Sequence, residues 1–211
     1  MKHENESPQK HLLLSEPLQV TEPLESLDIV ACRALCPYSR REYLGRLLWA
    51  LVTPVFRFSP RPFFGWRRGL LRLFGAYVGR EVHVYPSARI YLPWNLSLGD
   101  QASVGEWVLI YNLGPVIIGE RATISHRAHL CAGTHDYCAI NLPLLRLPIH
   151  IGAQAWVCAD AFVGPNVQVG EGAVVGAAAV VVSDVPPWKI VVGNPARIIK
   201  ERVLRSRGEN H

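Results

Sequence analysis

The sequence predicts an all-β fold, a parallel β-helix of six-residue repeats, preceded by short α-helices. The main observation is a set of twelve aliphatic residues that recur every six positions in three runs: Leu98, Val104, Ile110; Ile118, Ile124, Leu130; and Ile151, Val157, Val163, Val169, Val175, Val181. A period of six fits neither the 3.6-residue turn of an α-helix nor the two-residue alternation of a simple strand. It fits a short strand and a turn repeated around a coil, so that stacked coils bury an aliphatic column.

Two further observations support the coil. The residue that follows the aliphatic one is glycine at seven of the twelve positions. The residue four positions after the aliphatic one is mostly small. We expect the glycine to relieve the corner and the small residue to fill the space beside the aliphatic side chain. A sandwich of short strands would instead show strands about 8–12 residues apart. The composition, 49% hydrophobic but only 9% aromatic, agrees with tightly packed β-structure.

The period is interrupted in two places. The step from Ile110 to Ile118 takes eight residues, and the step from Leu130 to Ile151 takes 21. The second gap predicts a loop at about 136–149, which leaves the coil just after His135. Insertions in solenoids map to loops, where binding residues often lie.

The chain before the coil divides into two parts. Residues 1–40 form a polar, proline-punctuated leader without sustained periodicity, which predicts disorder, with a short helix within 24–36 as the alternative. Residues 41–77 predict basic amphipathic helices: one over 41–52, ended by Pro54, and a second over 65–74. The second has an apolar stripe of Trp66, Leu70, Leu73 and Phe74.

The helical part is strongly basic. Residues 41–80 contain eight arginines and one glutamate, a net charge of +7. The longest uncharged run is too short to span a bilayer, which needs about 20 apolar residues. Two interpretations are compatible: the helices cover one end of the coil, or the segment 41–75 makes an interfacial membrane contact.

The five cysteines form no even disulfide framework, and the N-terminal residues lack the apolar core of a secretory signal. We therefore expect a reduced, cytoplasmic protein, which the membrane interpretation of 41–75 would place at the inner face of a membrane. The spacing of Cys32 and Cys36 suggests metal only weakly, because no second pair completes a structural zinc site.

Together with the repeats, the segments "YNLGP" (111–115), "GTHDY" (133–137), "GAVVGAAAVVVSDVPPW" (172–188) and "GNPAR" (193–197) resemble the hexapeptide-repeat acyltransferases. The resemblance covers about residues 78–201 and is greatest to the colanic-acid-biosynthesis acetyltransferase branch. It implies a left-handed β-helix over 78–200, followed by a C-terminal tail at 201–211. It also implies a homotrimer with active sites between subunits, acetyl-coenzyme A (acetyl-CoA) as co-substrate and a histidine as general base, with no metal required.

The resemblance assigns roles to individual residues. His135 in "GTHDY" matches the family's base, and Asn112 in "IYNLGP" matches its acceptor-site asparagine. We expect Asp136 either to contact the acceptor or to cap the loop, and Tyr137 either to stack on a sugar ring or to pack between subunits. The residues that resemble the family's coenzyme contacts are Ala159, Ala177, Ser183, Arg197 and Lys200.

The predicted function is an O-acetyltransferase that moves acetyl from acetyl-CoA to a sugar hydroxyl in polysaccharide or lipid-linked glycan assembly, with no nucleic-acid partner. Such transfer needs a base for the hydroxyl proton, and histidine, with an ordinary pKa near 6.5, suits it near neutral pH.

Three alternatives remain open. Cys131 or Cys138 could act as a thiol nucleophile in a two-step reaction. His126, His129 and His135 could bind zinc, as in carbonic anhydrases of the same fold. The coil could also be a scaffold without activity, since fold does not dictate function.

Overall fold

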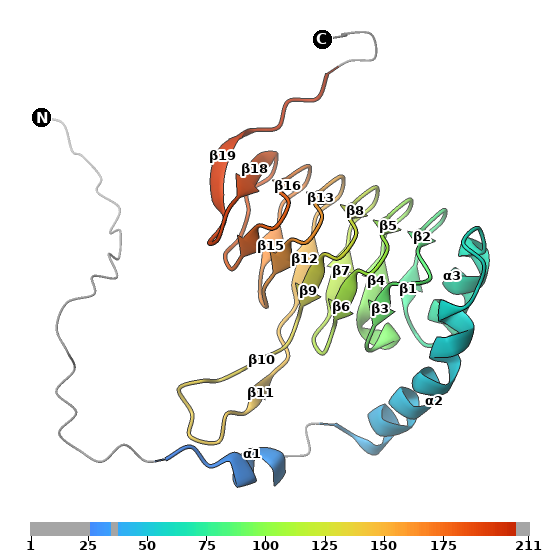
Figure 1. Cartoon of the computed structure of the whole chain (residues 1–211), viewed down its shortest axis with the longest axis vertical. Helices are drawn as coiled ribbons and strands as arrows, with labels where there is room; N and C mark the ends of the chain where they lie inside the picture. The colour runs from blue at the N-terminus through green and yellow to red at the C-terminus, as the bar shows by residue number, and fades with distance from the viewer. Residues whose placement is uncertain (1–25, 35–37, 206–211) are drawn as a thin grey trace, which may run out of the picture.

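A computed structural model describes residues 26–34 and 38–205 of the 211-residue chain. Short strands stack into a solenoid of about six turns, with helices at its N-terminal end (Figure 1). The α-helices are α1 (Ile29–Ala34), α2 (Arg40–Arg57) and α3 (Phe64–Leu73), and a 3-10 helix, η1, spans Pro93–Asn95. The predicted parallel β-helix is therefore confirmed. The part of the leader before residue 26 lies outside the described residues, as does Cys36.

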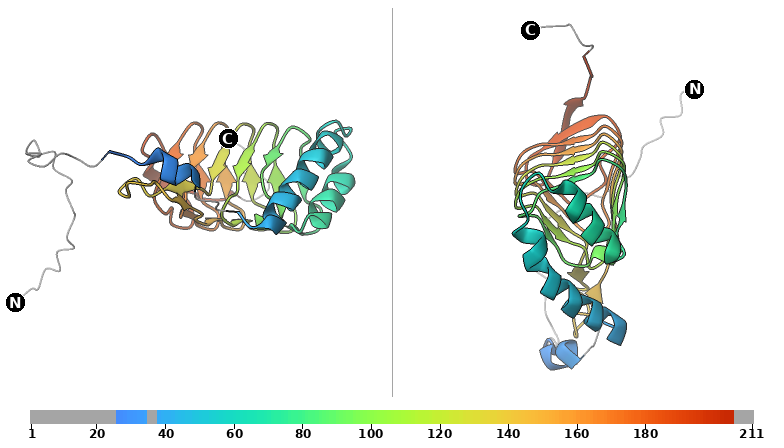
Figure 2. Two further views of the ribbon diagram at one scale, coloured as in Figure 1. Left: turned by 90° about the horizontal axis from the view of Figure 1, so that it is seen from below. Right: turned by 90° about the vertical axis from the view of Figure 1, so that its right-hand side faces the viewer.

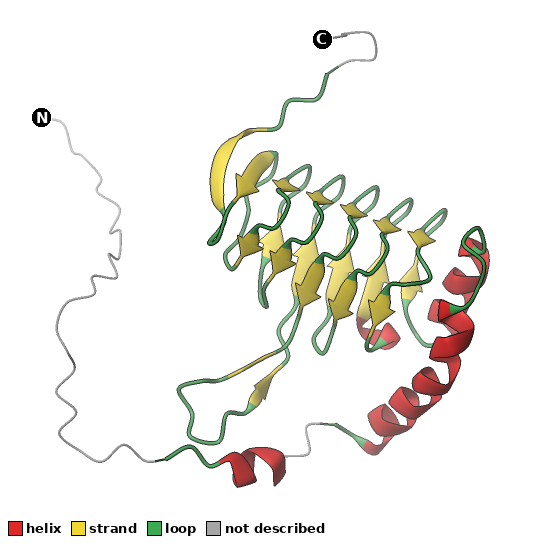
Figure 3. Ribbon diagram, in the orientation of Figure 1, coloured by secondary structure: helices red, strands yellow, loops and turns green. Residues whose placement is uncertain are grey.

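Three parallel sheets form the sides of the coil (Figure 3). The first contains β1 (Tyr77–Val78), β4 (Leu96–Leu98), β7 (Val116–Ile118), β12 (Ile149–Ile151) and β15 (Gln168–Val169). The second contains β2 (His83–Val84), β5 (Ser103–Val104), β8 (Thr123–Ile124), β13 (Trp156–Val157), β16 (Val174–Val175) and β18 (Lys189–Val192), with β19 (Arg197–Glu201) antiparallel at its end. The third contains β3 (Arg89–Ile90), β6 (Leu109–Tyr111), β9 (His129–Cys131), β14 (Phe162–Val163) and β17 (Val180–Val181).

The register follows the sequence period. Val78 pairs with Leu98 and Leu98 with Ile118, so the early coils take 20 residues, whereas Ile151 pairs with Val169 after 18. All twelve aliphatic residues of the period are at most 2% exposed. They form the column predicted from the sequence, and its burial contributes hydrophobic stabilisation along the whole coil.

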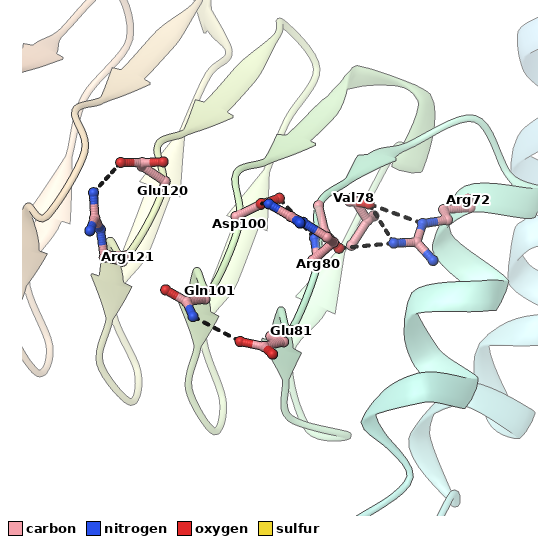
Figure 4. Close-up of polar contacts among 9 residues, drawn as sticks. Arg72, Val78, Arg80, Glu81, Asp100, Gln101, Glu120 and Arg121 are labelled. Carbon is pink, nitrogen blue, oxygen red and sulfur yellow. Dashed lines mark hydrogen bonds and ion pairs between the residues drawn. The ribbon is translucent and has the colours of Figure 1, made fainter.

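The helices close the open end of the coil (Figure 2, right). The strands β1, β2 and β3 are the first in their sheets, so their outer carbonyl groups have no neighbouring strand. Arg72 donates to the Val78 carbonyl on β1 (Figure 4), Arg67 donates to Val84 on β2 at 2.6 Å, and the Trp49 indole donates to Ile90 on β3 at 2.8 Å. A side chain of the helices thus donates to an edge carbonyl in each of the three sheets. Some of the arginines in residues 41–77 are therefore explained by this end cap.

Two predictions about the helices were wrong. The first helix does not end before Pro54 but continues to Arg57, because Phe56 is buried in the core and the Phe58 N–H bonds to the Pro54 carbonyl at 2.9 Å. That packing outweighs the helix hydrogen bond which proline cannot donate.

The apolar stripe of the second helix is also different. The buried face of α3 contains Arg67, Leu70 and Leu71, while Trp66 and Leu73 are exposed. Arg67 takes the inner position because it meets unpaired backbone carbonyls there. Among the described residues no helix has the length and hydrophobicity needed to cross a bilayer.

Candidate active site

The interruption after Leu130 forms an arm that projects from the coil (Figure 1). Its stem is an antiparallel pair, β10 (Thr134–His135) and β11 (Leu144–Leu145), in which His135 lies opposite Leu144. The arm therefore begins at Thr134, two residues before the predicted loop at about 136–149. Thr134 occupies the small-residue position of the repeat, yet it is half-exposed and pairs with Leu145 instead of entering the core. His135 is consequently a residue of the arm and not of the coil.

The arm orients the His135 ring. The side chain is exposed, and its Nδ1 lies 2.6 Å from the carbonyl oxygen of Leu142. A carbonyl oxygen can only accept, so Nδ1 must carry a proton, and Nε2 of the neutral ring keeps its lone pair. The turn fixes this carbonyl, because Leu142 adopts a φ of +42° and its N–H bonds to Ala139 at 3.0 Å. The arrangement presents Nε2 as a proton acceptor.

Asp136 and Tyr137 occupy different positions on the arm. The Asp136 carboxylate accepts a hydrogen bond from the backbone N–H of Cys138 at 3.0 Å, and its own N–H bonds to Pro143 across the arm. Asp136 thus caps the turn, one of its two expected roles. Tyr137 is 85% exposed near the turn of the arm.

Asn112 is completely buried, contrary to a role in direct acceptor contact within one chain. Its Oδ1 accepts from the backbone N–H groups of Tyr91 and Leu92 at 3.1 and 3.0 Å, and its Nδ2 donates to the Leu92 carbonyl at 2.6 Å. The amide therefore joins two successive coils at the corner after β6. Its effect on a ligand would come through the placement of Tyr91.

The residues expected to bind the coenzyme are only partly brought together. Ser183 and Arg197 line one cavity of about 370 Å³ at the C-terminal end of the coil. Ala159 and Ala177 stand 18 residues apart on successive coils, where the Ala178 N–H bonds to the Ala159 carbonyl at 2.9 Å. Lys200 is exposed on β19, across from Ile190, and does not line the cavity.

A cluster at the base of the arm was missed by sequence reasoning. The ring of Tyr38 lies between two guanidinium groups, with Arg46 at 4.2 Å and Arg146 at 4.6 Å from its centroid. Arg146 lies directly after β11, on the returning limb of the arm, and it also pairs with Glu42 at 2.7 Å. This ion pair connects the start of α2 with the arm. The Ser39 backbone N–H, followed by Arg146, holds the pKa of Glu42 below its ordinary value. No sequence signal connects residues 104 positions apart.

Three of the described cysteines, Cys131, Cys138 and Cys158, show no feature of a reactive thiol. Cys131 is half-buried and its thiol donates to the Gly133 carbonyl, while Cys138 is exposed on the arm. Burial raises the pKa of the Cys158 thiol, which disfavours the nucleophilic thiolate.

The three histidines of the zinc alternative are not gathered within the chain. His126 lines a shallow cavity between coils, and His129 packs against Phe162 on the third sheet. Burial lowers the pKa of His129. Within residues 26–34 and 38–205, no group of three His, Cys, Asp or Glu side chains is placed to hold a metal ion.

Comparison with known proteins identifies the family. No family model matches the chain. The chain is 43% identical over 158 residues to the Escherichia coli protein named colanic acid biosynthesis acetyltransferase WcaF. The matched region covers 75% of this chain and 87% of the relative.

Solved structures show the same fold at 22% identity. A maltose O-acetyltransferase from Clostridium difficile matches with a TM-score of 0.71 over 79% of this chain and 90% of its own. A galactoside acetyltransferase in complex with coenzyme A matches with a TM-score of 0.65 over 82% and 89%. The fold is thus the left-handed parallel β-helix. With the WcaF match extending over most of both sequences, the chain belongs to the family of hexapeptide-repeat acetyltransferases that includes WcaF.

Proposed function

We propose that this protein transfers an acetyl group from acetyl-CoA to a sugar hydroxyl in polysaccharide or glycan biosynthesis. The observation that carries the mechanism is the contact between His135 Nδ1 and the Leu142 carbonyl, which leaves Nε2 unprotonated in the neutral ring. The name of the 43% identical relative and the coenzyme in related structures support the substrate classes.

In the proposed reaction, His135 Nε2 removes the proton of the sugar hydroxyl as its oxygen attacks the thioester carbonyl. The carbon–sulfur bond then breaks, and the imidazolium returns the proton to the coenzyme thiolate. The Leu142 carbonyl keeps the ring oriented and stabilises the imidazolium while it exists. The acetyl group passes directly between the two substrates, so no cysteine is acylated.

For the site as a whole, we propose that Ser183, Arg197 and the corner of Ala159 and Ala177 contact the coenzyme, with Lys200 beside its phosphates. The cavity that Ser183 and Arg197 line supports this placement. We propose a homotrimer, because the exposed His135 stands on an arm outside its own coil, where it can face the groove of a second copy. Asp136, Tyr137 and, through Tyr91, Asn112 would shape the acceptor side.

An acetyl-transfer assay with acetyl-CoA over a panel of sugars, nucleotide sugars and lipid-linked sugars tests the function. His135→Ala should lower kcat by roughly 10²–10⁴-fold. His135→Asn should do the same, although its amide can still donate to the Leu142 carbonyl. Coenzyme binding should persist in both, and Cys131→Ala should retain turnover. Full turnover in His135→Ala would remove the proposed base, and loss of turnover in Cys131→Ala would favour the thiol route.

We also propose a membrane contact through α2. Its outer face contains the exposed apolar side chains Leu44, Leu47, Leu48, Leu51 and Val55, and Phe58 follows at the C-cap. These side chains are between 46% and 89% exposed. Arg40 and Arg41 are exposed at the start of the same helix. An apolar stripe with flanking arginines favours an anionic lipid surface.

Sedimentation with vesicles tests this contact. The protein should bind phosphatidylglycerol vesicles more strongly than phosphatidylcholine vesicles, and Leu47→Glu with Leu51→Glu should abolish the binding. Val203→Glu, at an 81% exposed residue far along the chain, is the matched control. Equal sedimentation of the double variant and the wild type would refute the contact.

A further inference from the structure

Another cavity lies between α2 and β3, away from the cavity that Ser183 and Arg197 line. Its volume is about 330 Å³, and one side of α2 lines it with Arg46, Trp49, Thr53 and Arg57, while the coil contributes Arg89, Ile90 and Tyr91. The four α2 residues recur at spacings of three and four, so they share one face of the helix. None of the side chains that line the cavity is acidic.

The three arginines of this cavity differ from the other arginines of the end cap. Arg67, Arg68 and Arg72 donate to backbone carbonyls of the first coil, and Arg61 pairs with Glu106. The ion pairs found among the described residues include neither Arg46, Arg57 nor Arg89: Arg80–Asp100, Arg121–Glu120, Arg127–Asp160, Arg146–Glu42, Lys189–Glu201 and Arg61–Glu106.

Arg46 provides an independent argument that the cavity binds an anion. Its Nη1 atom is buried and, within the part of the chain that the structure describes, has no hydrogen-bond partner. A buried donor without a partner destabilises the fold, and three like charges around one cavity repel. An anion in the cavity would remove both costs.

The remaining lining narrows the chemistry of that anion. Trp49, Phe56, Ala50 and Ala88 make the inner wall apolar, so the ligand must present charge to the arginines and little polarity to the wall. A carboxylate would bind one guanidinium group. A diphosphate carries a negative charge on each phosphate and has enough oxygens to bind several guanidinium groups at once. The cavity is near the lower end of ligand-site volumes, which suits a diphosphate and not a whole substrate.

The cavity adjoins the base of the arm. The Tyr91 ring stands edge-on to the Tyr111 ring at 4.8 Å, and Tyr111 pairs with Cys131, three residues before the arm starts. Arg46 and Arg146, which lies on the returning limb of the arm, both make cation–π contacts with the Tyr38 ring. A group bound between Arg46 and Arg89 could therefore extend along Tyr91 and Tyr111 toward the arm.

We propose that this cavity binds the diphosphate of a sugar diphosphate, which makes the acceptor an activated sugar and not a free one. The inference rests on the proposed acetyl transfer for its meaning as an acceptor site. Soluble nucleoside diphosphate sugars and lipid-linked diphosphate sugars share this chemistry.

Titration calorimetry on the full chain tests the binding. Inorganic pyrophosphate and UDP-glucose should bind in the presence of saturating coenzyme A, which occupies the other site. Arg46→Gln and Arg89→Gln should each weaken binding at least tenfold, while Arg121→Gln, at a distant corner, should not. Arg89 lies on the coil, so its variant remains informative if Arg46→Gln disturbs the arm. Absence of binding at millimolar ligand, or unchanged binding in both variants, would overturn the proposal.

Acetyl transfer then separates this proposal from the proposed function. UDP-glucose and a polyprenyl diphosphate-linked glucose in vesicles would be compared with free glucose. Preference for either diphosphate, lost in Arg89→Gln, supports the site and identifies the source. Equal transfer to free glucose in wild type and variant would overturn the acceptor role while the acetyltransferase function stands. If no sugar is acetylated, the function fails, and calorimetry alone decides the cavity.

Discussion

Arg67 shows at the scale of a residue how a charge can be buried without an acid. Its side chain is fully buried, and it donates to the Val84, Pro60 and Arg61 carbonyls and to the Ser59 hydroxyl. Burial lowers its pKa, but the guanidinium fork satisfies several acceptors that would otherwise be unpaired. It therefore acts as a structural connector between α3, the preceding turn and the first coil.

Replacing Arg67 should be strongly destabilising. In Arg67→Met four acceptors lose their donor, and two of these, the Val84 carbonyl and the Ser59 hydroxyl, are buried. We therefore expect a loss of about 3–5 kcal/mol in the free energy of unfolding. Arg68→Met, which removes a single bond to the Val82 carbonyl, should cost about 1 kcal/mol. Urea unfolding of both variants measures the difference. Similar losses would mean that burial of Arg67 contributes nothing special.

The catalytic candidates show what sequence can do at this scale. His135 was selected by a motif, but its tautomer depends on a carbonyl seven residues away, which only the turn of the arm brings near. Asn112 was selected in the same way, yet its side-chain amide hydrogen-bonds to the backbone of Tyr91 and Leu92 on the neighbouring coil. A motif identifies residue types and positions, whereas the direction of each side chain depends on contacts that the motif does not contain.

At the scale of elements, α2 connects the cap to the arm. Ser39 and Glu42 form a capping box at the start of α2, and Glu42 also pairs with Arg146 at the returning limb of the arm. The short helix α1 and the residue before it contact the same arm: the Asp28 N–H bonds to the Ile140 carbonyl at 3.0 Å, and the Cys32 thiol on α1 donates to the Leu142 carbonyl. Two helices thus hold the arm that positions His135.

The link through Glu42 should depend on pH. The pKa of Glu42 is lowered, first by the Ser39 backbone N–H, so the carboxylate stabilises the fold above its ordinary pKa of 4.5. This contribution is lost as the pH falls through the lowered value. Glu42→Gln should therefore cost about 1 kcal/mol at pH 7, and less as the pH falls below 4.5. Denaturant unfolding at several pH values measures it, with Glu106→Gln, at an exposed pair, as the control. A pH-independent difference would contradict the role of the carboxylate.

At the scale of the whole molecule, the spacing of the coils sets the requirement for glycine. The six-residue pattern predicts that glycine relieves the corners, but left-handed backbone positions there are occupied by residues such as Gln101 and Arg121, with φ near +60°. Gly119 serves a different purpose, because a Cβ on it would lie 2.5 Å from the backbone nitrogen of Ala153 on the next coil. Its absence of a side chain lets two coils approach.

Gly119→Ala should test this spacing. The added methyl group meets backbone that cannot move without separating the coils, and we expect a loss of about 2 kcal/mol. Gly69→Ala on α3, where no heavy atom lies within 4 Å, should instead raise stability by up to about 1 kcal/mol. Thermal unfolding compares the two. Equal midpoints would show that the coils adjust to the methyl group.

The sequence by itself determined the coil, its inward-facing column and the position of the interruption, because a six-residue period repeats one local geometry and each repeat needs only its neighbours. The tertiary structure alone decided which arginines cap the open end, that α2 continues past Pro54, and that Glu42 meets Arg146. It also decided that one cavity is lined by three arginines that form no ion pair with the other described residues. These features join segments far apart in the chain, and no local pattern records such contacts, because their energy depends on which unsatisfied groups the folded coil presents.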